Sequence, residues 1–139
     1  MNRLVTFTTA ALLALVVAAP ALSGSSATIT IRHQVRGCHT WSFNGGASKA
    51  SQSISLAKGT KLTVIDIDIM PHKLVQVSGP TLKLPASAAM HKMSASTAFT
   101  FAKAGTYKFT TKAGEDYMSM PMMKTIGEDY VLKLKVVVS

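Results

Sequence analysis

Residues 61–75 read KLTVIDIDIMPHKLV, and this stretch decides the fold. Leu62 and Val64 follow the two-residue period of a half-buried strand, and the isoleucines at 65, 67 and 69 continue it less cleanly. Pro71 separates this pattern from the next strand, at 74–77, and fixes His72 between them. An imidazole held rigidly between two strands lies at the rim of a sandwich, where it is well placed to bind a metal ion.

Short strand patterns separated by turns continue on both sides of this stretch. Residues 85–90 predict only a short helix, and helical periodicity is otherwise almost absent. Seven or eight strands of this kind predict an all-β sandwich. The further strand patterns cover 28–35, 53–56, 97–101, 107–111 and 130–138, with turns at 57–60, 78–80 and 103–105.

Residues 1–23 are predicted to be a secretory signal peptide. A basic start, MNR, precedes an apolar run from Leu4 to Ala19, and small residues suited to signal peptidase follow. A membrane anchor is the alternative, although the run is short for a span. We therefore expect one mature domain, 24–139, in the periplasm or outside the cell, with no stable membrane span after cleavage.

The formal net charge is +9, and it comes from scattered lysines rather than from a basic run. Nucleic-acid binding usually requires clustered Lys and Arg with interleaved aromatic residues, so we expect no nucleic-acid partner. A solvated basic surface explains the charge in structural terms. The functional alternatives are an acidic protein partner or an anionic membrane face.

Three segments resemble the cupredoxins, which are small copper-binding β-sandwiches. They are SLAKGTKLTV at 55–64, MPH at 70–72 and GTYKF at 105–109, and they occur in the family's order. The resemblance implies a cupredoxin-like Greek-key β-sandwich that binds one copper ion. It also implies that His72 is the first histidine ligand and that Met118 stands where the family's axial methionine would be.

The chain departs from the cupredoxin pattern at the remaining ligands. Thr111 stands where the family has its cysteine, and residues 113–116, AGED, replace the second histidine. An ordinary blue-copper site owes its character to the copper–thiolate bond, so such a site cannot be carried over. The loop after the first strand of the family lies at the metal end, and here it contains Cys38 and His39.

The predicted ligand set is therefore Cys38, His39, His72 and Met118, with Glu115 as an alternative fourth ligand. Structural explanations stay open for each residue, because a free cysteine is often buried and a rim histidine can be purely structural. His33 shares the parity of the core residue Ile31 and is predicted to be a buried core histidine.

Methionines are the second signal, most densely at 118–123, MSMPMM. Thioethers bind Cu(I), but methionine is also common on apolar contact surfaces, and the pattern leaves both open. Residues 90–93, MHKM, predict a weaker second site of the same chemistry.

These observations predict an exported copper-binding protein that carries copper or transfers electrons through a non-standard site. The alternative is a metal-free interaction module of the cell envelope. Glu115 and Asp116 are adjacent carboxylates and a tempting acid/base pair, but no nucleophile or catalytic motif accompanies them. We therefore do not expect an enzyme; a copper enzyme would also need an open coordination position and a partner.

Overall fold

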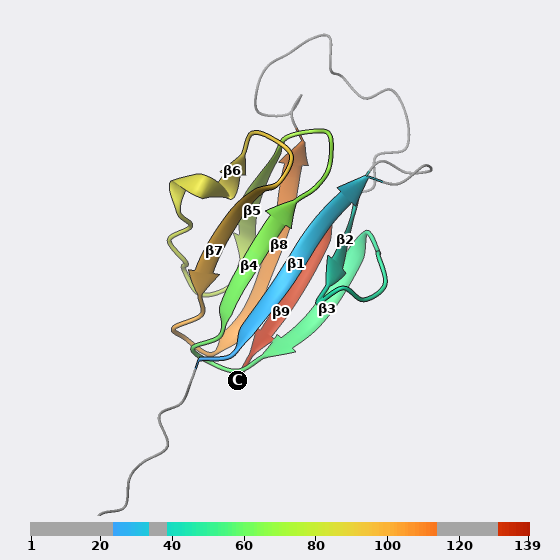
Figure 1. The fold of residues 1–139 in the computed structure, drawn as a ribbon. Coiled ribbons are helices and arrows are strands. Elements are labelled where there is room, and N and C mark those ends of the chain that lie inside the picture. Colours follow the sequence, from blue (N-terminus) through green and yellow to red (C-terminus); the bar gives the residue numbers. More distant parts are fainter. Residues whose placement is uncertain (1–23, 34–38, 114–130) are drawn as a thin grey trace, which may run out of the picture.

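The computed structural model describes residues 24–33, 39–113 and 131–139 (Figure 1). Two mixed sheets pack face to face, which confirms the predicted all-β sandwich. The described residues form nine strands, where seven or eight were predicted; the strands that no sequence pattern predicted are β2 and the two-residue β6. The elements are β1 (Ser26–His33), β2 (His39–Phe43), β3 (Ser51–Leu56), β4 (Lys61–Asp66), β5 (His72–Ser78), η1 (Ala86–Ala88), β6 (Ala89–Met90), β7 (Ala95–Thr100), β8 (Gly105–Ala113) and β9 (Lys133–Val138).

The first sheet has the order β2-β1-β4-β7, and the second has the order β3-β9-β8-β5-β6. The pairs β1–β4 and β3–β9 are parallel, and the other pairs are antiparallel. Sequence-adjacent strands therefore often lie in different sheets. This arrangement brings the ends of β1, β4 and β8 to the same end of the sandwich as the beginnings of β2 and β5, at the top of Figure 1.

Alternating inward residues of both sheets build the core. Ile29 and Val64 of the first sheet are fully buried. Tyr107 and Val136 of the second sheet are at most 1% exposed. Aromatic rings join the layers, with the Phe101 and Tyr107 centroids 4.8 Å apart in an edge-on arrangement. Burial of this continuous apolar layer is the main force that holds the sheets together.

Within the segment 85–90, where a short helix was predicted, Ala86–Ala88 form one 3-10 turn, η1, whereas Ala89–Met90 form the strand β6. His39 was expected in a loop, and this was wrong, because β2 begins at His39. The four residues from His39 to Ser42 are all buried, so β2 lacks the alternation by which a strand is recognised in a sequence. No helix among the described residues could span a bilayer.

Gly79 is the turn residue at which a side chain should destabilise the fold most. Its φ is +110°, and a Cβ there would lie 2.5 Å from the Thr106 carbonyl oxygen. We expect Gly79→Ala to lower the free energy of unfolding by about 2 kcal/mol, from left-handed strain and backbone displacement together. Urea unfolding measures this. Gly45→Ala is the control, because Gly45 has φ +74° but open space around it, and an equal loss in both variants would contradict the steric argument.

Candidate metal centre

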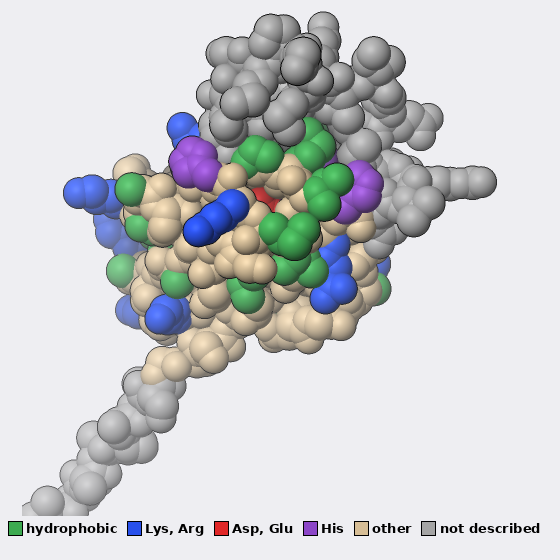
Figure 2. All heavy atoms as spheres, turned by 45° about the horizontal axis from the view of Figure 1, so that its top comes forward, with side chains coloured by type: hydrophobic (Ala, Val, Ile, Leu, Met, Phe, Trp, Pro, Cys, Tyr) green, Lys and Arg blue, Asp and Glu red, His purple; other side chains and the backbone are tan. Residues whose placement is uncertain are grey.

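The register of the first sheet brings two histidines together. β1 ends at His33 and β2 begins at His39, and these residues are direct partners in the antiparallel pair. Their side chains therefore lie on neighbouring strands at one end of the sandwich, with ring centroids 6.4 Å apart. Figure 2 shows this end obliquely: two groups of exposed histidine side chains are seen, with a small area of acidic side chain between them, whereas His39 itself is buried.

Asp68 is the centre of the cluster. It follows β4 by two residues and is fully buried. Its Oδ2 accepts hydrogen bonds from His39 Nδ1 at 2.7 Å and from His72 Nε2 at 3.2 Å. Its Oδ1 accepts the Met70 N–H at 3.1 Å and lies 3.7 Å from His33 Nδ1. One carboxylate thus connects three imidazoles that come from three different strands.

His72 is held on both sides of its ring. Nε2 faces Asp68, and Nδ1 lies 3.2 Å from Thr111 Oγ1 on β8. The ring is fully buried and meets His39 edge-on, with centroids 4.6 Å apart. β6 pairs His72 with Met90, whose side chain is also buried. The rigid imidazole that the proline–histidine sequence predicted is therefore present at the rim, oriented by two hydrogen-bonding partners.

Burial alone would raise the pKa of Asp68. Hydrogen bonds from His39 and His72, together with the Met70 N–H, outweigh this effect and hold the pKa well below its usual range. Asp68 is consequently ionised at any ordinary pH, and its carboxylate accepts the hydrogen bonds of His39 Nδ1 and His72 Nε2. The Asp68 carboxylate is an anion that accepts hydrogen bonds from the imidazoles, and the same negative charge would attract a metal cation.

Asp66 is a second buried carboxylate at this end. Burial raises its pKa to about 6, against smaller lowering effects from His72 and from the Asp68 N–H. Its Oδ1 accepts that N–H at 2.9 Å, while the buried Oδ2 has no hydrogen-bond partner among the described residues. This incompletely satisfied negative group adds to the field that would attract a cation to Asp68.

His33, His39 and Asp68 form the group best suited to hold a metal ion. One donor atom from each lies within 4.8 Å of the others. The 3.7 Å between His33 Nδ1 and Asp68 Oδ1 suits two ligands of one ion, since bonds of about 2.1 Å would then meet at about 120°. The 2.7 Å between His39 and Asp68 is shorter than such a spacing, so a metal ion would have to replace the shared proton and separate these groups slightly.

The structure brings together two of the predicted ligands, His39 and His72. Cys38, Met118, Glu115 and the methionines at 120–123 lie outside the described residues. The prediction that His33 is a core histidine was wrong, because its side chain is 42% exposed. β1 ends at His33, where the strand leaves the area covered by the opposite sheet, so the parity of Ile31 no longer implies burial.

Sequence reasoning missed both aspartates. Leu62, Val64, Asp66 and Asp68 are all buried, while the isoleucines that alternate with them are partly or fully exposed. The signal was present in the sequence, because the inward parity set by Leu62 and Val64 leads directly to the two aspartates. Two carboxylates that continue the buried face of a strand indicate a polar site at the end of that strand.

The second weak site predicted at 90–93 is not gathered in one place. Met90 is buried beside His72, whereas His91 and Met93 are exposed. Met90 therefore belongs to the surroundings of the main cluster, and only its exposed neighbours lie on the surface.

No protein-family profile matches the chain, and no curated protein is similar to it in sequence. Among solved structures, the chain is similar in fold to a purple cupredoxin from Nitrosopumilus maritimus, with 18% identity, 81% of this chain and 98% of that chain covered, and a TM-score of 0.49. It is also similar to a reduced proline-to-phenylalanine variant of amicyanin, with 20% identity, coverage of 86% and 85%, and a TM-score of 0.43. An oxidised methionine-to-leucine variant of amicyanin shares 23% identity, with coverage of 79% and 80% and a TM-score of 0.41.

Proposed function

We propose that this protein binds one copper ion at the end of the sandwich and carries it. The observation that supports this most strongly is the convergence of His33, His39 and Asp68, whose donor atoms lie within 4.8 Å of one another. Two imidazoles and a carboxylate are common ligands of divalent transition metals. His72 lies against these three donors. Its Nε2 either holds the Asp68 carboxylate by a hydrogen bond or, without its proton, becomes a further metal ligand.

Copper is the metal we propose because the donor set extends from hard to soft ligands. A site of nitrogen and oxygen donors binds Cu(II) more tightly than the other divalent first-row ions, including zinc. Cys38, next to His39 in the chain, and Met118 stay proposed ligands that would suit Cu(I). The sequence resemblance to cupredoxins supports the same metal.

Carriage accounts for this donor set better than electron transfer does. Rapid electron transfer requires nearly the same coordination in both oxidation states. Here the imidazole–carboxylate core favours Cu(II), while the proposed thiolate and thioethers favour Cu(I), so reduction would change the ligands. Such a change assists capture and release of the ion. Export through the predicted signal peptide at 1–23 stays part of this proposal.

A titration of the purified protein with Cu(II) in a competing chelator tests the proposal. We expect His39→Gln to weaken binding by at least about tenfold, because a buried donor of the central group is lost. His91→Gln is the matched control, since it removes an exposed histidine outside the cluster and should leave the affinity unchanged. Equal affinities for the wild type and both variants would reject the site.

A further inference from the structure

The outer face of the second sheet carries five lysines. They are exposed on three adjacent strands, at Lys73, Lys108, Lys112, Lys133 and Lys135. Two pairs are directly opposite in the register, Lys73 with Lys112 and Lys108 with Lys135. Like charges directly opposite one another destabilise a sheet, so the isolated fold gains nothing from this arrangement.

Among the described residues, no acidic side chain pairs with these lysines, and the four acidic residues at 115–116 and 128–129 lie outside the described residues. The acidic residues of the described part are Asp66 and Asp68, and both are buried in the histidine cluster. The ion pairs found between described residues all join Asp68 to histidines. The positive charge of the lysine face is therefore not compensated by the part of the fold that carries it.

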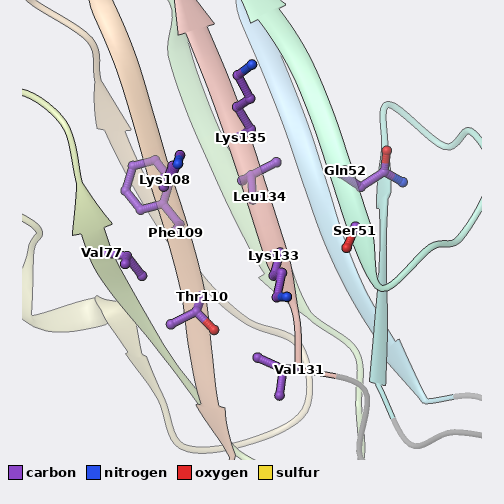
Figure 3. Close-up of a pocket in the computed structure, with 10 residues that line it drawn as sticks. All are labelled: Ser51, Gln52, Val77, Lys108, Phe109, Thr110, Val131, Lys133, Leu134 and Lys135. Atoms are coloured by element: carbon purple, nitrogen blue, oxygen red, sulfur yellow. The ribbon is translucent and has the colours of Figure 1, made fainter.

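A hollow of about 550 Å³ lies within the lysine face. Figure 3 shows Lys108, Lys133 and Lys135 around it, with Val77 from β5 at the left and Val131, which precedes β9, at the bottom. These two valines are 61% and 65% exposed, and they account for two of the four large apolar side chains exposed on the described surface. An apolar depression with a charged rim has the composition of a protein-binding site rather than of a merely solvated face.

We propose that this lysine face binds an acidic protein that presents carboxylates around a protruding apolar side chain. Carboxylates would satisfy the opposed lysines, and the apolar group would fill the hollow beside Val77 and Val131. A bilayer surface is flat and would leave the hollow empty. The face also begins at Lys73, next to His72, so a bound partner would reach the edge of the histidine cluster. The docking surface does not depend on bound copper.

The test is an NMR titration of the ¹⁵N-labelled full chain in EDTA with the synthetic peptide Glu-Glu-Leu-Glu-Glu, blocked at both ends. We expect shifts confined to amides of β5, β8 and β9 around the hollow. The variant Lys108→Thr/Lys135→Thr should bind at least about tenfold more weakly, since two charge contacts of a docking surface are lost. It should melt no lower than the wild type, because the opposed pair is repulsive.

The matched control is Lys61→Thr/Lys103→Thr, which removes the same charge from exposed positions outside the face. An equal loss of affinity in both double variants would overturn the proposal, since net charge alone would then explain binding.

Replacing the central leucine of the peptide with serine should also weaken binding, and no change would contradict a role for the hollow. Binding to phosphatidylglycerol vesicles but not to the peptide would assign the face to a membrane and overturn the proposal. None of these outcomes depends on the metal ligands, so failure here leaves the copper proposal standing.

Discussion

Asp68→Asn should weaken Cu(II) binding by about 100-fold or more, the largest loss expected from any single substitution in this protein. Asparagine keeps the size of the side chain but removes the anionic charge that lies between the imidazoles of His33, His39 and His72. A neutral amide oxygen is a much poorer ligand for a divalent ion than a carboxylate. The amide would also hold the histidines less firmly, because charge-assisted hydrogen bonds become neutral ones.

Asp66→Asn provides a matched control for this experiment. It removes the same charge from a buried residue two positions away. Asp66 accepts backbone N–H groups, from Asp68 and His72, and no hydrogen bond between Asp66 and an imidazole is found among the described residues. Chelator competition at pH 7 should show a loss of less than about tenfold for this variant. Similar losses for both variants would mean that general electrostatics, rather than coordination by Asp68, governs the affinity.

The second large effect concerns stability and pH. Burial raises the pKa of folded Asp66 to about 6, whereas the ordinary value is 3.8. The folded state therefore binds the proton more tightly than the unfolded state, and the free energy of unfolding falls as pH rises from about 4 to about 6. A shift of this size corresponds to about 3 kcal/mol of stability, lost in full above pH 6.

Asp66→Asn should remove this loss. We expect the variant's stability relative to the wild type to increase by about 3 kcal/mol between pH 4 and pH 7. Urea unfolding of both metal-free proteins in EDTA across this range measures the difference. The lowered pKa of Asp68 acts in the opposite direction, since its stabilisation is lost as pH falls below about 4, but both proteins share it and it cancels. A difference that stays constant with pH would contradict the burial of an ionisable Asp66.

Much of the fold could be predicted because alternation and turn residues are local signals. The patterns predicted at 61–69, 97–101 and 107–111 overlap β4, β7 and β8, and the Gly79–Pro80 turn follows β5. β2 could not be predicted in this way. Its residues from His39 to Ser42 are all buried, and they are held by pairing with β1, which is a relation between strands rather than a pattern within one.

The candidate site was predicted in part for a similar physical reason. His72 was recognised because Pro71 marks a rigid position, and His39 because the expected topology brings its segment to the same end. Asp68 was missed because hydrophobicity directed attention to the neighbouring isoleucines, although the parity of Leu62 and Val64 points to the aspartates. The contact between His33 and Asp68 depends on where β1 and β4 end relative to each other, and no single segment contains that information.

The most direct test of the account is an anomalous difference map, recorded at the copper edge from crystals of the Cu(II)-loaded protein. We expect one strong peak between His33, His39 and Asp68, with donor atoms about 2 Å from the ion. A peak bound by exposed His91, or by the residue 118–123 segment alone with Asp68 still hydrogen-bonded to His39 and His72, would contradict it.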